Sequence, residues 1–262
     1  MKKLILILKN LKKYGVVAVK QSLEDEGAFF EDIKKMRSIS TSAGLGLNVK
    51  IGGCEAKNDI HFCKKIKVDG IVAPMVESQY ALNKFLQTVT EKKRNSLYIN
   101  LETITSFKNI NSMMKSPNFR FLKGVIIGRS DLAGSLGLTK KQVDSKVIFK
   151  KVFNLLKKVK RRKIIVKMGG SITPGSQEFI LKLFKKKLID RVETRNIEIL
   201  LSKKNVKNLK NIIIKAFNFE LEWIKYKLKN HRSKDAIFIK KEYISRIEEI
   251  EKRIKVLNII DE

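Results

Sequence analysis

The chain has 262 residues, 43% of them hydrophobic and 8% aromatic, which excludes a disordered polypeptide and allows one large domain with a sizeable core. No apolar run approaches the roughly 20 residues that cross a bilayer, so the sequence also argues against a membrane-spanning protein. The net charge of +31 raises the alternative of nucleic-acid binding. The basic residues are spread along the whole chain, however, and no aromatics are interleaved with the densest run at 157–163, which favours a solvated lysine surface.

The first 13 residues, MKKLILILKNLKK, predict an amphipathic helix. Their apolar run from Leu4 to Leu8 is short and lacks a small-residue cleavage site, so we expect a cytoplasmic protein rather than a secreted one. Cys54 and Cys63 have no further cysteine partners for a zinc site or a disulfide framework. They are expected to be free thiols in a reducing compartment.

From residue 16 onward, short β-rich runs alternate with longer amphipathic runs, which predicts βα units around a parallel sheet. Seven strands are expected, at 16–24, 47–53, 70–76, 97–102, 124–128, 164–170 and 189–195. Helices are expected between them, the first ending at the C-cap candidate Gly44. The pattern is one strand short of a closed eight-stranded (β/α)8 TIM barrel, so closure would need an element that the pattern does not reveal, with an atypical N-terminal strand as one option.

Beyond residue 205 the strand signals stop and two helical stripes follow, from Val206 to Leu228 and from Ile247 to Leu257. We therefore predict a catalytic barrel over residues 1–204 and C-terminal helices over residues 205–262. The spacing of the second stripe suits packing on the barrel or on a neighbouring subunit.

Polar residues are concentrated where the predicted strands end, and the C-terminal ends of barrel strands are where active sites are built. The set comprises Lys20, Glu24, Glu26, Lys50, Glu77, Asn100, Glu102, Ser130, Asp131, Lys167, Glu193 and Arg195. Glu102 and Asp131 follow successive strands and would form a half-shell for Mg²⁺ or Mn²⁺, which prefer oxygen ligands. Lys50 could then stabilise an anionic substrate group or an enolate.

Three segments carry a resemblance: DGIVAPMVES at 69–78, LYINLETITSFKNI at 97–110 and GVIIGRSDLAGSLG at 124–137. Over residues 16–195 the chain resembles the HpcH/HpaI aldolase and citrate lyase β-subunit family of pyruvate-type TIM barrels. The shared motifs are Glu102-Thr103 with Asn109, and the Gly128-x-x-Asp131 loop. The resemblance implies a divalent metal on Glu102 and Asp131, Asn100 beside the substrate, and substrate carboxylate contacts near Ser130.

The same resemblance implies a metal-dependent lyase of class II aldolase type, acting through the enolate of a 2-oxo acid such as pyruvate, and a homo-oligomer. Lys50 stands where the family usually has Arg, and no histidine follows the first strand, so Glu24 or Glu26 is the expected base or water-orienting group. Three alternatives stay open: an acyl-CoA lyase like the citrate lyase β subunit, a basic nucleic-acid-binding protein, and a non-catalytic barrel.

Overall fold

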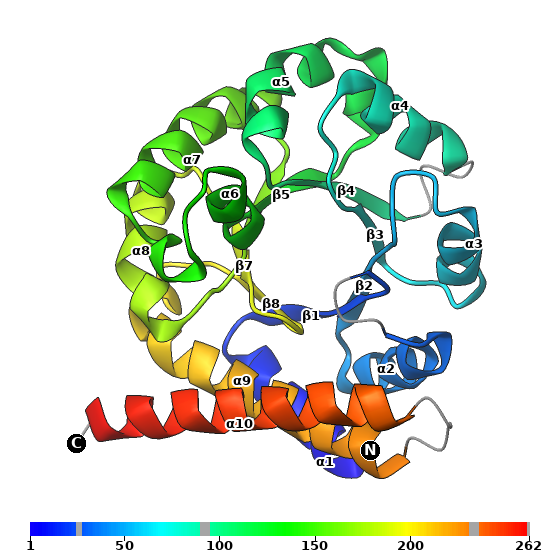
Figure 1. Cartoon of the computed structure of the whole chain (residues 1–262), viewed down its shortest axis with the longest axis vertical. Coiled ribbons are helices and arrows are strands. Elements are labelled where there is room, and N and C mark those ends of the chain that lie inside the picture. Colours follow the sequence, from blue (N-terminus) through cyan, green and yellow to red (C-terminus); the bar gives the residue numbers. More distant parts are fainter. Residues whose placement is uncertain (25–27, 90–94, 231–235, 261–262) are drawn as a thin grey trace.

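A computed structural model describes residues 1–24, 28–89, 95–230 and 236–260. Eight strands form a closed barrel in sequence order, surrounded by helices (Figure 1). The strands are β1 Val16–Ser22, β2 Gly46–Lys50, β3 Gly70–Ala73, β4 Ser96–Leu101, β5 Gly124–Gly128, β6 Ile165–Gly169, β7 Arg191–Glu193 and β8 Ile197–Leu200. The helices are α1 Lys2–Lys13, α2 Phe30–Ala43, α3 Lys57–Lys65, α4 Gln79–Thr88, α5 Ile104–Lys115, α6 Arg129–Ser135, α7 Lys146–Val159, α8 Gln177–Lys185, α9 Leu209–Asn230 and α10 Ala236–Ile260.

The seven strands expected from the sequence are present as β1 to β7, and consecutive pairs among them are parallel. Their side chains alternate between the barrel interior and the layer beneath the helices. In β4, Leu97, Ile99 and Leu101 belong to the large apolar core, whereas Tyr98 packs inside the barrel with Val72 and Ile126. The TIM-barrel prediction is confirmed.

The barrel is closed by β8, which the sequence pattern did not reveal. A turn at residues 194–196 reverses the chain after β7, so β8 pairs antiparallel with β7 on one side and with β1 on the other. The N-terminal segment is the predicted amphipathic helix and not a strand: α1 buries Leu4, Leu8 and Leu11. An atypical N-terminal strand was therefore the wrong closing element.

Because β8 runs against the other strands, the chain leaves the barrel beside the start of β1, where the Leu200 amide donates to the Gly15 carbonyl. Helix α9 then packs against α1, and α10 folds back along α9 (Figure 1). Both C-terminal helical stripes are thus confirmed as helices. No helix among the described residues has the length and apolar composition needed to cross a bilayer.

The structure corrects one local prediction, at residues 129–135, and confirms another, at Gly44. The segment RSDLAGS, expected to be a loop, forms the short helix α6 directly after β5. Gly44 ends α2 in the left-handed conformation with φ 68°, as expected of a helix C-cap.

Candidate active site at the C-terminal end of the barrel

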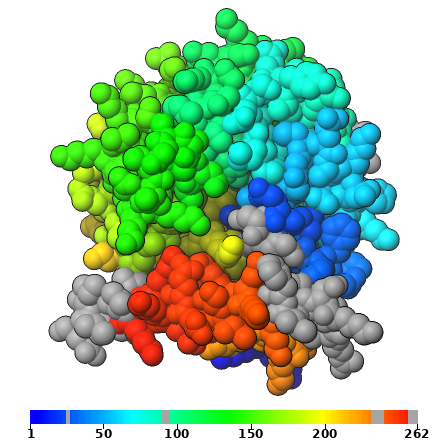
Figure 2. All heavy atoms as spheres, viewed as in Figure 1, coloured from blue at the N-terminus to red at the C-terminus, as the bar shows by residue number. Residues whose placement is uncertain are grey.

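A cavity of about 870 Å³ lies at the C-terminal ends of the parallel strands. In Figure 2 the surface is hollowed between the green α6 segment and the orange-red α10. Strand-borne polar groups lining it are Lys20, Lys50, Asn100 and Glu193, with Glu24, Glu102, Ser130 and Asp131 just beyond strand ends. These residues, predicted at separate strand ends, and Arg195 therefore line one cavity, whereas Glu77 and Lys167 of the predicted set do not line it. Glu26 lies outside the described residues.

Glu102 is a buried carboxylate of the cavity that two hydrogen bonds hold in place. Its side chain is buried, its Oε1 accepts a 2.9 Å hydrogen bond from the Met75 amide, and its Oε2 accepts one of 2.9 Å from Asn100 Nδ2. Burial raises the pKa of Glu102 and the nearby Asp131 raises it further, while the Met75 amide, Lys50 and Asn100 partly oppose this rise. A cation beside the two carboxylates would relieve both the burial and the repulsion.

The loop that carries Met75 is tied to β4 by the predicted Glu-Thr and Asn motif. Thr103 Oγ1 donates to Glu77 Oε1 at 2.5 Å, and Asn109 Nδ2 donates to the Glu77 carbonyl at 2.8 Å. Met75 itself has φ 51°, a left-handed conformation that is unusual for a residue other than glycine. The motif thus holds the loop so that the Met75 amide is directed at Glu102.

Gly128, at the end of β5, makes room for the Glu102 side chain. A Cβ at Gly128 would lie 2.6 Å from Glu102 Oε2 and 2.7 Å from Glu102 Cβ. Such approaches are closer than real Cβ contacts, so only glycine fits this position. The Gly128-x-x-Asp131 motif therefore combines a cradle for one carboxylate with a second carboxylate at the start of α6.

These residues fit a divalent cation. Mg²⁺ commonly binds to one or two protein carboxylates and keeps several waters, and Glu102 with Asp131 supplies such a pair. Asn100 Oδ1 is also buried without a hydrogen-bond partner, and Asn100 lines the same cavity. Among the residues that the structure describes, no three His, Cys, Asp or Glu side chains gather around one point. Any ion held here would complete its shell with water or substrate.

The second predicted charged group, Lys50, lies on β2 with its side chain largely buried. Its Nζ is 2.5 Å from Glu24 Oε2. Glu24, predicted as a base, is therefore paired with Lys50. Ser130, predicted beside the substrate carboxylate, shares a 2.8 Å hydrogen bond with Ser171 from the loop after β6.

A row of alternating charges lies beneath the cavity, inside the barrel. Lys167 Nζ is 2.6 Å from Glu198 Oε2 and stacks over the Tyr98 ring, 3.6 Å from its centroid. Burial alone would lower the pKa of Lys167, but Glu193 and Glu198 more than offset it and leave that pKa raised. Lys167 was predicted at a strand end, but it lies deeper, in the barrel interior.

Arg129 is a structural residue that sequence reasoning missed. Its fully buried guanidinium pairs with Asp144 and donates to the carbonyls of Gly169 and Gly170. It therefore joins α6, which carries Asp131, to the loop after β6. The only sequence signal was an arginine directly after an apolar strand, where a solvated side chain is the ordinary expectation.

Helix α10 covers one side of the cavity. Arg246, Glu249 and Arg253 line it from α10, and Phe217 and Glu220 line it from α9. Arg246 Nε donates to the buried Glu220 Oε1 at 2.8 Å, which fastens the two helices together. The C-terminal helices thus contribute directly to the site.

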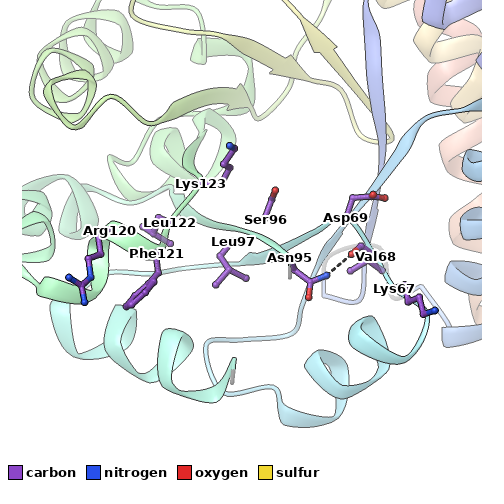
Figure 3. A pocket seen from close by; sticks show the side chains of 10 residues that line it. All are labelled: Lys67, Val68, Asp69, Asn95, Ser96, Leu97, Arg120, Phe121, Leu122 and Lys123. Atoms are coloured by element: carbon purple, nitrogen blue, oxygen red, sulfur yellow. Dashed lines mark hydrogen bonds between the residues drawn. The ribbon is translucent and has the colours of Figure 1, made fainter. Parts of the chain in front are cut away.

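A different cavity, of about 610 Å³, lies at the opposite end of the barrel, around the starts of β3, β4 and β5 (Figure 3). Its buried Asn95 donates to the Val68 carbonyl at 2.5 Å. The basic ends of Lys67, Arg120 and Lys123 point in different directions in Figure 3 and do not converge on one point. This cavity lacks the paired carboxylates of the site above.

No protein-family model matches the chain, and no curated protein matches its sequence. Solved structures do match. The HpcH/HpaI aldolase from Desulfitobacterium hafniense aligns with a TM-score of 0.60 and 13% identity over 72% of this chain and 81% of that chain. The chain shares the fold of the HpcH/HpaI aldolases. The resemblance predicted from the sequence motifs is thus confirmed as a structural similarity.

Two further structures extend this HpcH/HpaI-like comparison. An HpcH/HpaI aldolase/citrate lyase family protein from Burkholderia cenocepacia has a TM-score of 0.59 and 11% identity, with 84% of this chain and 90% of that chain covered. Citrate synthase SbnG has a TM-score of 0.59 and 13% identity, with 83% and 89% covered. All three comparisons are at 13% identity or below and show that the chain shares this fold.

Proposed function

We propose that the protein is a divalent-metal-dependent carbon–carbon lyase of class II aldolase type, acting through the enolate of a 2-oxo acid such as pyruvate. The observation that carries the proposal is the pairing of Glu102 with Asp131 beside the Gly128 cradle, at the end of the barrel where such enzymes place their chemistry. Glu102 and Asp131 would hold Mg²⁺ or Mn²⁺. The ion would supply Lewis-acid stabilisation of negative charge on the substrate oxygens.

The chain's own residues would orient the substrate around that ion. The Met75 amide and Asn100 fix the Glu102 carboxylate, while Asn100 Oδ1 offers an acceptor to a substrate or water donor. Lys50 would stabilise the substrate carboxylate or the developing enolate from β2. Ser130 would contact the substrate carboxylate. Glu24, paired with Lys50, would order a water molecule, and Glu26, predicted for the same role, lies outside the described residues.

Isothermal titration with Mn²⁺ tests the metal site directly. We expect the wild type to bind Mn²⁺, and Glu102→Gln and Asp131→Asn each to weaken binding by at least tenfold. Glu178→Gln on the exposed surface of α8 is the matched control and should bind like the wild type. Equal affinity in all four proteins would refute the assignment.

A second candidate is an acyl-CoA lyase similar to the citrate lyase β subunit. A side cavity of about 510 Å³ lies between α9, α10 and the β7–β8 turn, and it shares Arg195, Arg246 and Glu249 with the main cavity. Such a space favours a substrate longer than pyruvate. Screening for release of acetyl-CoA against release of pyruvate separates the two candidates.

The oligomeric state and the compartment of the protein are also part of the proposal. We propose a homo-oligomer in a reducing, cytoplasmic compartment, in keeping with free thiols at Cys54 and Cys63. Light scattering during size-exclusion chromatography measures the oligomeric state.

A salt-dependent gel shift tests the nucleic-acid alternative. A protein that folds and binds Mn²⁺ without any turnover would favour the non-catalytic barrel.

A further inference from the structure

Lys20 and Glu193 face each other at the floor of the cavity. They come from β1 and β7, the two strands that flank β8, whereas Glu102 and Asp131 follow β4 and β5 on the other side of the closed barrel (Figure 1). Both residues line the cavity. A substrate held by the carboxylate pair would therefore extend toward Lys20 and Glu193.

The two groups are close but not hydrogen-bonded. Lys20 Nζ is 3.7 Å from Glu193 Oε2, a separation longer than a hydrogen bond. Within the described part of the chain, the Lys20 ammonium donates no hydrogen bond, although 19% of its side chain is exposed. Glu193 is 1% exposed in its side chain, and its Oε1 has no hydrogen-bond partner. Buried carboxylates are normally satisfied, so this arrangement calls for an explanation.

The lysine beneath them does not supply the missing contact. Lys167 Nζ is 3.5 Å from Glu193 Oε1, but it lies 2.6 Å from Glu198 and over the Tyr98 ring. Glu198 also accepts from Arg191 and from Asn48, which fixes this lower cluster. Glu193 therefore keeps acceptor capacity, and Lys20, 3.7 Å from Glu193 Oε2, keeps donors above this fixed cluster.

A hydroxyl group is the ligand chemistry that satisfies both partners, because it accepts a hydrogen bond from an ammonium and donates one to a carboxylate. We propose that Lys20 and Glu193 bind a hydroxyl group of the substrate between them, with Glu193 as the base for its proton and Lys20 as the cation beside the resulting alkoxide. This inference rests on the proposed lyase function, and it assigns the base to Glu193, whereas Glu24 lies 2.5 Å from Lys50 Nζ.

The proton and electron balance is that of a retro-aldol cleavage. Glu193 takes the hydroxyl proton, and the electron pair of the O–H bond forms the new carbonyl. The carbon–carbon bond breaks, and its electron pair passes to the 2-oxo acid fragment as an enolate. The protonated Glu193 then returns its proton to the enolate carbon, which lies next to the carbon that bore the hydroxyl. No oxidant or other co-reactant is needed.

A matched pair of non-cleavable acids tests the binding claim on the Mn²⁺-loaded protein. Isothermal titration would compare 2,4-dihydroxybutanoate with 2-hydroxybutanoate, which lacks only the distal hydroxyl. One charge-assisted hydrogen bond predicts that the wild type binds the dihydroxy acid about 10-fold to 100-fold more tightly. Lys20→Met and Glu193→Gln should each bring this ratio close to one. Lys123→Met, at the opposite end of the barrel, should keep it.

Kinetics add a readout that a purely structural ion pair would not move. With 4-hydroxy-2-oxobutanoate as the probe, Glu193→Gln should lower kcat for pyruvate release by about 10²-fold to 10⁴-fold and remove the acid limb of the pH profile, with Mn²⁺ affinity unchanged. Lys20→Met keeps the test decisive if Glu193→Gln folds poorly, because Lys20 is partly exposed.

The outcomes distinguish failure of the role of Lys20 and Glu193 from failure of the lyase function. The role of Lys20 and Glu193 is overturned if the protein releases pyruvate but shows no preference for the dihydroxy acid. It is also overturned if that preference survives both substitutions. In either case the lyase function stands. A wild type that binds neither Mn²⁺ nor either acid, and releases no pyruvate, overturns both.

Discussion

A Cβ at Gly128 would come within 2.6 Å of Glu102 Oε2, so the buried carboxylate and the glycine of the next strand fit together only without a side chain at 128. We expect Gly128→Ala to push the Glu102 carboxylate out of position and weaken Mn²⁺ binding by about tenfold or more. Overpacking of this kind should also lower the free energy of unfolding by about 1–3 kcal/mol. Titration calorimetry and urea unfolding measure the two effects.

Gly134→Ala is the matched control for that substitution. Gly134 also lines the cavity, but a Cβ there meets no atom within 4 Å, and it lies in α6, where alanine is favoured. Its Mn²⁺ affinity should equal that of the wild type. Identical affinities for both alanine variants would contradict the cradle.

The charge cluster inside the barrel predicts strong dependence of stability on Lys167. Lys167→Met leaves Glu198 and Glu193 buried without their shared cation, and removal of one member of a buried ion pair costs about 3–5 kcal/mol. Urea unfolding at pH 7 measures the loss. Lys182→Met, which breaks an exposed pair on α8, should change the free energy of unfolding by less than about 1 kcal/mol.

The same cluster predicts a component of acid lability. Burial alone would raise the pKa of Glu198, but Lys167 and Arg191 hold it below the ordinary value of 4.5. A carboxyl whose pKa is lowered on folding stabilises the protein above its unfolded pKa, and this contribution is lost as the pH falls through the folded value. Unfolding free energies measured from pH 7 to pH 2 should therefore fall below about pH 4.5. Glu198→Gln should be less stable at pH 7 and show a shallower decline.

The two cysteines should react at different rates. Burial raises the pKa of Cys63 to about 12 and also raises the pKa of the half-buried Cys54. Because the thiolate is the reactive form, Ellman's reagent at pH 8 should modify Cys54 slowly and Cys63 only after unfolding. Cys54→Ser should remove the native-state reaction. Rapid modification of two thiols in the folded protein would contradict the packing of α3.

The pair Arg246 and Glu220 predicts how firmly α10 is held. Arg246→Met leaves the buried Glu220 carboxylate without its cation and should weaken docking of α10 by about 1–3 kcal/mol. Hydrogen exchange followed by mass spectrometry should show faster exchange along residues 243–253. Lys225→Ala removes an exposed pair with Glu251 and should leave the exchange rates nearly unchanged.

Much of the barrel could be predicted because β1 to β7 each carry a local signal, an apolar run followed by an amphipathic stretch. β8 has only four residues, of which Glu198 is charged, and it follows β7 after a three-residue turn. No helix separates the two strands, so the βα alternation could not reveal it. β8 lies where it does because it fills the space between β7 and β1, and that space exists only once the sheet has closed.

The part of the candidate site that lies at the ends of strands could be predicted from the sequence. Glu102 and Asp131 were predicted to share a site because consecutive parallel strands end at the same edge of the sheet, and both residues line the cavity. The pairing of Lys50 with Glu24 and the anchoring role of Arg129 depend on contacts between different loops, which residue spacing does not encode. Lys167 was placed too near the rim because a strand pattern gives the direction of a side chain and not its depth in the barrel.

The reversed direction of β8 also places the exit of the chain far from the site that the C-terminal helices complete. The chain leaves the barrel at the end remote from the cavity, and α9 must return along the outside before α10 can reach the rim. A nascent chain that has emerged through residue 200 contains every strand but none of the α10 side chains that line the cavity. A chain that ends at residue 200 would therefore hold all eight strands of the barrel but lack the α9 and α10 side of the cavity.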